Sequence, residues 1–381
     1  MPTLRFAASF LFALGLLVGC GGTSTTSSSK PASSSPAPSA TPAPDVAGAA
    51  TSSGSPGSLI AVVVEGSPTT LHLVTLGGRD VARTSVPSFA SVAGVGGDMA
   101  TFVVGDQLKA LRPTGAIETL GRLPGYSAGK IIVSPDGQQW MWSVYSTSGS
   151  SVNSKLMLGT RGGADRTIAE QTTTTEPRIL QPYRWGPAGP VYQSSAMGLG
   201  GYILFGEFTT GPTWRVDPAT GQTATLLAGN SCTLADLAPD GTIACFEQPG
   251  GGLLNVLSPG GHVVQVPLPK PAFTQAGAVS FKPGSKAGTL VIGGATSAGA
   301  SGGREQYEMD LIDVGARSLH RLGPAGLRPG DGPWTWLPDG SLISYRPARA
   351  LGGDPGIYLI SKGGLAKKVS ASGIPIGVLN G

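Results

Sequence analysis

From Leu59 onward the chain alternates short apolar, β-branched runs with turns rich in Gly and Pro. Runs such as Leu59 to Val64, Leu71 to Leu76 and Ile357 to Ser361 have the length of strands, and no apolar pattern of helical period continues for three turns. The content of Gly 60 and Pro 32 approaches a level that suggests disorder, but 40% hydrophobic residues in such runs indicate turns between strands. We therefore predict an all-β body over residues 58–381.

Tight turns with a common chemistry recur through this body. Proline fixes the first turn torsion, aspartate caps the turn through its side chain, and glycine accepts a positive φ. The clearest copies are Ser134-Pro135-Asp136-Gly137, Ala238-Pro239-Asp240-Gly241 and Leu337-Pro338-Asp339-Gly340, and weaker ones are Gly186-Pro187-Ala188-Gly189 and Lys282-Pro283-Gly284-Ser285. Each is expected to join two strands of a hairpin.

A second series of glycine turns has seven copies: Gly77-Gly78, Thr114-Gly115, Gly162-Gly163, Thr220-Gly221, Gly260-Gly261, Gly315 and Gly363-Gly364. Six intervals separate Gly78 from Gly364, so the mean period is about 48 residues, which fits four strands per unit. A body of roughly 320 residues also exceeds the usual single core, which favours growth by repetition. The period predicts a seven-bladed β-propeller, with six or eight blades as alternatives.

The order of strand, x-Pro-Asp-Gly turn, strand, strand, glycine turn and last strand resembles the PD40 (WD40-like) repeats of TolB-like β-propellers. The resemblance covers roughly Leu59 to Gly381, and three of the turns keep all of Pro, Asp and Gly. It implies the propeller fold and leaves function open. The amino-terminal domain of TolB has no counterpart in this sequence, because a low-complexity segment occupies its place.

The ends of the body predict how the ring closes. The first unit has strands near Leu59 to Val64, Leu71 to Leu76 and Asp80 to Val86, with no inner strand before them. A spare apolar strand, Ile374 to Leu379, follows the last unit. We expect this strand to supply the missing inner strand of the first blade and so to remove two open edges.

The amino-terminal segment resembles the signal of bacterial lipoproteins. Leu17-Val18-Gly19-Cys20 ends an apolar stretch that is shorter than the roughly 20 residues of a spanning helix. This lipobox-like ending implies cleavage after residue 19 and a lipid on Cys20, with a disordered Ser/Thr/Pro/Ala tether over residues 20–57. The expected location is the extracytoplasmic face of the cell membrane; an ordinary secretory signal and a retained anchor are the alternatives.

Two cysteines remain after Cys20. Cys232 and Cys245 flank the turn at Pro239, so the hairpin brings them near each other, and an exported protein permits a disulfide. Two buried free thiols are the alternative. His72, His262 and His320 have no neighbouring Cys or His at ligand spacing, and no linear catalytic or phosphate-binding motif is present. We therefore predict no metal, no cofactor and no catalytic residue.

The formal charge of +4 comes from scattered Lys and Arg, whereas nucleic-acid binding would need a clustered basic stripe. The leading hypothesis is a membrane-anchored lipoprotein whose propeller is a binding scaffold for an envelope protein or glycan. An enzyme, either a propeller lyase or a glycan hydrolase with its site at the central channel, is the alternative. A structural member of an envelope assembly is a third.

The predicted binding face carries the long connections between the second and third strands of the blades, opposite the tight turns. These connections are expected at Ser146 to Ser151, Ser194 to Gly201, Thr296 to Arg304 and Arg346 to Gly353. Long loops on one rim of a rigid scaffold are common places for recognition. The candidate anchors there are apolar or basic: Met197, Leu199, Arg304, Arg346, Arg349 and Leu351. Insertions without a binding role are the alternative.

Overall fold

A computed structural model describes most of the body of the chain. The described residues are 57–126, 129–197, 205, 211–229, 232–247, 252–268, 275–285, 288–296, 304–330 and 335–379. The predicted signal, Cys20 and almost the whole tether lie outside these residues. Within them, no helix has the length and apolar character needed to cross a membrane.

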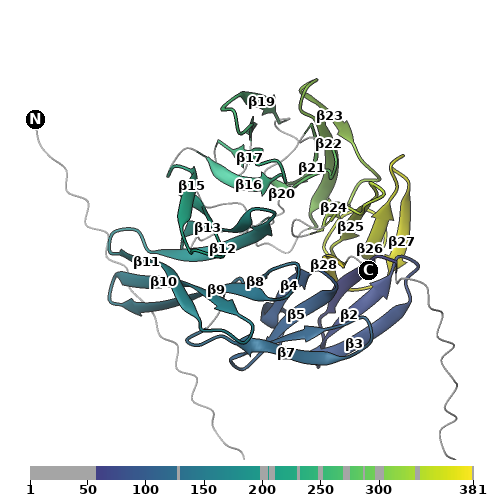
Figure 1. Ribbon diagram of the computed structural model, residues 1–381. Coiled ribbons are helices and arrows are strands. Elements are labelled where there is room, and N and C mark those ends of the chain that lie inside the picture. Colours follow the sequence, from purple (N-terminus) through teal and green to yellow (C-terminus); the bar gives the residue numbers. More distant parts are fainter. Residues whose placement is uncertain are drawn as a thin grey trace, which may run out of the picture. The chain divides into compact units, whose positions relative to one another are not determined.

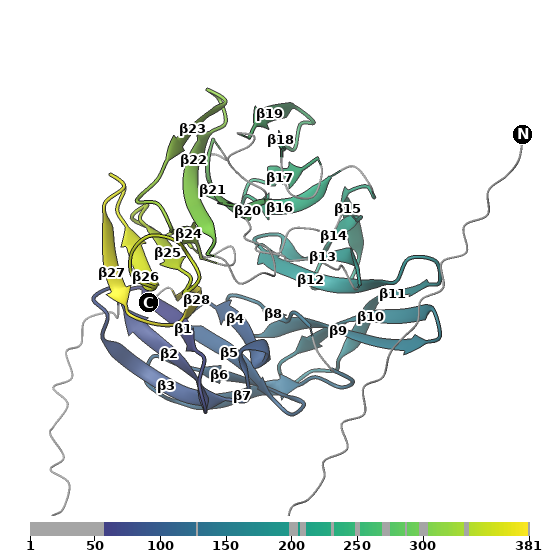
Figure 2. The same ribbon diagram turned by 180° about the vertical axis from the view of Figure 1, so that it is seen from behind.

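The described strands form seven four-stranded sheets, which are the blades of a propeller arranged round a central axis (Figures 1 and 2). The strands are named here from the inner strand of each blade outward. Blade 1 contains β28 (Ile374–Leu379), β1 (Leu59–Val64), β2 (Thr69–Thr75) and β3 (Asp80–Val86); blade 2 contains β4 (Val92–Gly96), β5 (Met99–Val104), β6 (Gln107–Leu111) and β7 (Ile117–Arg122); and blade 3 contains β8 (Ile132–Val133), β9 (Gln139–Ser148), β10 (Ser151–Thr160) and β11 (Arg166–Thr173). Blade 4 contains β12 (Arg178–Gly186), β13 (Gly189–Ala196), β14 (Thr213–Val216) and β15 (Thr223–Leu227); blade 5 contains β16 (Thr233–Leu237), β17 (Ile243–Phe246), β18 (Leu253–Leu257) and β19 (Val263–Pro267); blade 6 contains β20 (Gln275–Phe281), β21 (Thr289–Thr296), β22 (Gln306–Asp313) and β23 (Ser318–Arg321); and blade 7 contains β24 (Arg328–Pro329), β25 (Leu342–Arg346), β26 (Gly356–Ile360) and β27 (Ala366–Ser370). A short 3-10 helix, η1 (Phe89–Ser91), links blades 1 and 2.

The last strand of the chain closes the ring, as predicted. Strand β28 pairs antiparallel with β1, with Leu379 opposite Leu59 and Ile374 opposite Val63. The first blade therefore combines the two ends of the propeller sequence. This pairing gives β1 a partner on each side, so β1 is not left with the open edge that attracts other chains.

The tight turns have the chemistry that the sequence predicts. In each of the three Pro-Asp-Gly turns an aspartate oxygen accepts a hydrogen bond from the backbone N–H two residues later, at 3.0 Å for Asp136, 2.9 Å for Asp240 and 2.8 Å for Asp339. Gly137 has a φ of 69°, a region where a side chain is strained. Turns of the second glycine series connect the third and fourth strands of the seven blades.

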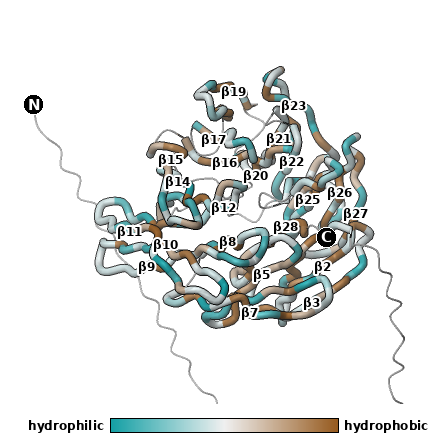
Figure 3. Tube along the Cα trace, in the orientation of Figure 1, coloured by the Kyte–Doolittle hydropathy of each residue, from teal (hydrophilic) through white to brown (hydrophobic). Residues whose placement is uncertain are grey.

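The apolar core is divided among the interfaces between neighbouring blades. Seven clusters of buried residues within the described part of the chain each join two adjacent blades, including one between blades 7 and 1. Figure 3 shows hydrophobic and hydrophilic stretches alternating along the strands. Because each blade packs on both sides, the body can exceed the size of a single core.

Trp140 and Trp142 belong to this core and not to an exposed aromatic site. They are 2% and 0% exposed and pack between blades 2 and 3. The ring of Trp140 lies directly against Gly121 and Gly159, where a β-carbon would collide with it. Glycine at these two positions therefore makes room for one of the two tryptophan rings of the interface.

Candidate functional site

Bulges interrupt the innermost strands of five blades where they face the centre of the propeller. In β4, β12, β16, β20 and β28 the pairing register shifts, and the skipped residues are Ala93, Tyr183, Ala235, Ala278 with Val279, and Ile376. All of these residues line one central cavity. A bulge turns two consecutive side chains toward the same side, which simple alternation along a strand does not allow.

The central cavity has a volume of about 530 Å³ and draws its wall from all seven blades within the described residues. The contributing residues include, from blade 1 to blade 7, Ile376, Val95, Ile132, Arg184, Asp236, Val279 and Arg328. Phe89, Lys130 and Phe205 also line it, and they lie in connections that emerge on the face of the long loops. The cavity therefore reaches that face, which we call the loop face.

Arg184 and Asp236 form a buried ion pair in the wall of the cavity. The guanidinium Nη1 of Arg184 in blade 4 donates to Asp236 Oδ1 in blade 5, and their side chains are 10% and 4% exposed. Asp236 Oδ2 accepts a 2.7 Å hydrogen bond from the backbone N–H of Phe281 in blade 6. Burial raises the pKa of the Asp236 carboxyl, while Arg184 and this N–H oppose the rise. Asp236 thus joins three consecutive blades.

Two further cations line the cavity beside aromatic rings. The Lys130 ammonium lies 4.9 Å from the ring centre of Tyr183, the residue before Arg184. Arg328 is 5% exposed, and its guanidinium carbon lies 4.6 Å, 5.8 Å and 5.1 Å from the ring centres of Phe205, Tyr307 and Tyr345. Aromatic faces attract a cation and hold it in place.

A backbone contact between two loops gathers part of the predicted rim. Glu305 N donates to Arg349 O at 3.0 Å, and Leu351 N donates to Glu305 O at 2.8 Å. This pairing joins the β21–β22 and β25–β26 connections, so that exposed Arg304, Arg349 and Leu351 lie near one another on the loop face. Leu351 is 39% exposed and is one of two exposed leucines, with Leu365, among the described residues.

Arg346 differs from the other predicted rim residues because it is only 8% exposed. Its Nη2 donates to Ala325 O at 2.7 Å, and its guanidinium lies 5.4 Å from the ring centre of Tyr358. It therefore supports the loops from below and does not face solvent. A sequence pattern cannot distinguish an arginine buried beneath the loops from one exposed on the rim, since both stand at the end of a strand.

The remaining rim predictions have different outcomes. Met197 lies just after β13 and is partly exposed, whereas Leu199 lies outside the described residues. The expected long connection at Ser146 to Ser151 is wrong, because β9 runs to Ser148 and β10 starts at Ser151, and these two residues pair directly. The serines and threonines there extend the β9–β10 hairpin beyond the core. They are polar because this end of the hairpin is exposed to solvent, and not because they form a loop.

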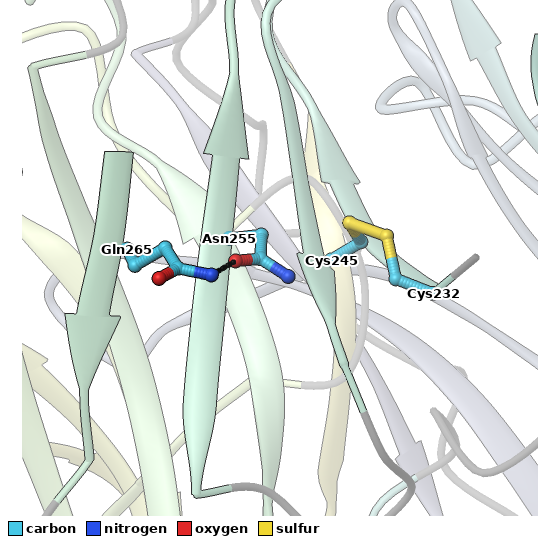
Figure 4. The surroundings of a disulfide bond; sticks show 4 residues. All are labelled: Cys232, Cys245, Asn255 and Gln265. Carbon is cyan, nitrogen blue, oxygen red and sulfur yellow. Dashed lines mark hydrogen bonds between the residues drawn. A yellow bond between two sulfur atoms is a disulfide. The ribbon is translucent and has the colours of Figure 1, made fainter. Parts of the chain in front are cut away.

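A disulfide joins Cys232 and Cys245, whose Cα atoms are 5.7 Å apart (Figure 4). Both side chains are buried in the cluster between blades 4 and 5. Asn255 and Gln265 continue the same row across the sheet, and Gln265 Nε2 donates to Asn255 Oδ1 at 3.2 Å. The bond fixes the start of the inner strand that carries Asp236.

Two properties of the other titratable residues in the described chain bear on function: metal-binding geometry and shifted pKa values. Within the residues that the structure describes, no three of His, Cys, Asp and Glu come together as a set that could hold a metal. His72 Nδ1 lies 2.9 Å from Asp80 Oδ2 on the outer part of blade 1. Burial raises the pKa of Asp310, while Asp313, three residues later, accepts a turn N–H from Ala316 at 2.9 Å.

The cavity residues carry only weak signals in the sequence. Ala93-Gly94 and Gly277-Ala278 are pairs of small residues inside apolar strands, where glycine often marks a bulge. Arg184 and Asp236 are isolated charges 52 residues apart, and nothing in the sequence pairs them. Pairs of small residues in the expected inner strands were thus the available sequence signal for the bulges that line the cavity.

Comparisons with known proteins support the fold. No model of a known protein family matches the chain, and no curated protein matches it in sequence. Among solved structures, Pyrococcus horikoshii acylaminoacyl peptidase is 10% identical, with a TM-score of 0.51 over 82% of this chain and 50% of that one. TolB from Acinetobacter baumannii is 17% identical (TM-score 0.41; 68% of this chain and 62% of that one). An oligogalacturonate lyase from Vibrio parahaemolyticus is 10% identical (TM-score 0.48; 78% and 85%).

These likenesses concern the fold alone. The chain spans less than two thirds of TolB and half of the peptidase, and the identities are too low to carry an activity across. The strand order of the described residues establishes the body of this chain as a seven-bladed β-propeller, and TolB is among its structural neighbours.

Proposed function

We propose that this protein is a lipid-anchored binding protein of the cell envelope, whose propeller takes up a ligand in the central cavity and presents the loop face to its surroundings. Cys20 would carry the lipid, and residues 20–57 would hold the propeller away from the membrane. The cavity carries the binding part of this proposal. Its volume of about 530 Å³ lies in the usual range of small-molecule sites, and it combines apolar walls with a few charged groups.

The exposed part of the rim supports a second contact of the same scaffold. Arg304, Arg349 and Leu351 form an apolar and basic patch, and residues of this kind are common interface anchors. An envelope protein or a glycan could contact this patch while a ligand occupies the cavity. The patch therefore agrees with a scaffold function.

The enzyme alternative is less well supported by the cavity. Asp236 is the carboxylate among the described cavity residues, and both its oxygens are engaged, one by Arg184 and the other by the N–H of Phe281. A general acid or base must exchange its proton with a substrate. Asp236 is better suited to hold blades together.

The test is native mass spectrometry of the protein purified from membranes of its own host. Wild type should carry a lipid at Cys20 and a bound small molecule. Gln181→Trp, which fills the cavity from its wall, should retain the lipid and lose the small molecule. Gln265→Trp on the exposed outer strand β19 is the matched control and should retain both.

Two results would contradict the proposal. An unmodified amino terminus elsewhere than Cys20, in protein that partitions into water, would reject the anchor. A small molecule that survives Gln181→Trp, or wild type that carries none from its native membranes, would reject binding in the cavity.

A further inference from the structure

We propose that the propeller contacts the lipid surface through one edge of its turn face, formed by blades 7, 1 and 2, so that the loop face points away from the membrane. The turn face is the face of the tight turns, opposite the loop face. This inference rests on the proposed lipid anchor and adds how the anchored propeller stands on the membrane. Three features carry it: the place where the chain enters the propeller, a set of exposed apolar side chains, and the charges beside them.

The chain enters the propeller on the turn face of blade 1. Strand β1 starts at Leu59, which pairs with Thr75, and Thr75 closes the glycine turn between β2 and β3 through backbone hydrogen bonds. Strand β1 then runs to Val64, which precedes the β1–β2 connection on the loop face. The proposed tether is therefore joined to blade 1 on the turn face.

Four of the exposed large apolar side chains occupy the same place in their blades. Val81, Ile117, Val263 and Leu365 are 36%, 50%, 45% and 78% exposed. Each lies at the start of an outermost strand or just before it, beside a glycine turn of the turn face. The outermost strands of the other three blades start with polar residues: Arg166, Thr223 and Ser318.

Three of the four side chains belong to consecutive blades, with the entry of the chain in the middle. Leu365 precedes β27 of blade 7, Val81 lies in β3 of blade 1 and Ile117 starts β7 of blade 2 (Figures 1 and 2). Blades 7 and 1 touch at this edge, where a β-carbon on Gly78 would collide with the carbonyl oxygen of Val369 in β27. The edge that is joined to the tether is thus the edge with most of these exposed apolar side chains.

The charges at this edge do not oppose a membrane. In blades 7 and 1 three exposed cations have no ion pair within the described residues: Arg79, Lys362 and Lys367. Two carboxylates stand in the same turns; Asp80 contacts a histidine and Asp339 caps its own turn. In blade 2 the nearby carboxylates are paired with arginines. Cations are thus in slight excess, and an anionic leaflet attracts Lys and Arg near its surface.

A lipid surface fits this arrangement better than a protein partner does. The three side chains stand on separate blades with polar turns between them, so a protein would need a matching hollow for each. The boundary of headgroups and acyl chains admits apolar side chains at any spacing, to a depth of roughly 5–10 Å.

The tether makes a weak contact sufficient. A coil of its length has a mean reach of roughly 30–35 Å, which allows the propeller both to stand away from the membrane and to return to it. Because the tether keeps the edge near the lipid, the effective concentration of the membrane is high and three partly exposed side chains can hold the edge there.

Fluorescence quenching on vesicles tests the contact. A chain of residues 21–381 with an amino-terminal histidine tag is held on phosphatidylcholine and phosphatidylglycerol vesicles by a nickel-chelating lipid, which takes the place of the lipid on Cys20. One introduced cysteine carries the fluorophore NBD, because Cys232 and Cys245 are already joined. Nitroxide-labelled lipids then quench a fluorophore that lies at the membrane surface.

Lys362→Cys is the reporter for the edge, because it changes none of the three apolar residues. We expect nitroxide lipids to remove at least about half of its emission, since an edge in contact lies among the headgroups. Val263→Cys, at the equivalent place in blade 5, and Leu351→Cys on the loop face are the matched controls and should keep their emission.

Loss of the three apolar side chains should release the edge. Val81→Ser, Ile117→Ser and Leu365→Ser together should restore the emission of the Lys362→Cys reporter and leave thermal unfolding nearly unchanged, because these side chains are exposed. Val263→Ser is the matched control and should leave the quenching as it is.

The outcomes separate this contact from the proposed anchor. Equal quenching at positions 362 and 263 would overturn the choice of edge, and stronger quenching at position 351 would overturn the orientation. Quenching that survives the three serine changes would overturn the role of the apolar residues. No quenching at any position would overturn the lipid contact and leave this edge to a protein partner. Mass spectrometry decides the natural lipid on Cys20 separately, because the nickel-chelating lipid anchors the chain in either case.

Discussion

Removal of the Asp236 carboxylate is the sharpest test of how the propeller is held together. Asp236→Ala leaves the Arg184 guanidinium buried without its counter-charge and the N–H of Phe281 without its acceptor. Loss of one partner of a buried ion pair costs about 3–5 kcal/mol. A domain is typically stable by only about 5–15 kcal/mol, so this change removes a large part of the total.

Urea and thermal unfolding measure the effect. At roughly 2 °C for each kcal/mol in a large domain, the midpoint of thermal unfolding should fall by about 6–10 °C. Asp236→Asn keeps an acceptor for the N–H of Phe281 and loses the charge, so its loss should be smaller. Arg184→Met with Asp236→Leu exchanges the pair for apolar groups and should lie close to wild type.

The double-mutant cycle decides the reasoning. The cycle compares Arg184→Met, Asp236→Leu and the double variant that carries both changes. If Arg184 and Asp236 depend on each other, the double variant loses far less unfolding free energy than the sum of the losses of the two single variants. An Asp236→Ala protein within about 0.5 kcal/mol of wild type, or strictly additive losses, would refute the structural role assigned to this pair.

Three further predictions concern the ring, the disulfide and acid stability. Deletion of residues 374–381 should cause aggregation or loss of cooperative unfolding, because β1 becomes an open edge, whereas deletion of residues 380–381 alone should melt as wild type does. Replacing Cys232 and Cys245 together by Ala should lower the unfolding free energy in urea by about 3 kcal/mol in the chain-entropy model; an unchanged midpoint would contradict it. Arg161 and Arg112 hold the pKa of Glu118 below its usual 4.5, so the stability from Glu118 is full above pH 4.5 and is lost as the pH falls through the folded-state pKa. Glu118→Gln should flatten the dependence of stability on pH in that acidic range, and an equal slope in the variant would show that Glu118 has no such role.

The sequence alone determined the features of this protein that depend on local chemistry. Alternating apolar residues and the turns at Asp136, Asp240 and Asp339 specify strands and hairpins, because side-chain capping and a positive φ at glycine act within a few residues. The seven glycine turns from Gly77-Gly78 to Gly363-Gly364 give the number of blades. The spare strand Ile374–Leu379 predicts how the ring closes, since the first blade lacks an inner strand beside Leu59–Val64 and this strand can take that place.

Only the tertiary structure decided where charges meet and which of them are buried. Arg184, Asp236 and Phe281 come from three blades, and their contact depends on inner-strand bulges that no local pattern specifies. The same holds for Arg346, which the sequence places on an exposed rim and the fold places beneath it. The physical reason is that turns are set by neighbours along the chain, whereas a channel wall is set by how separate sheets pack round an axis.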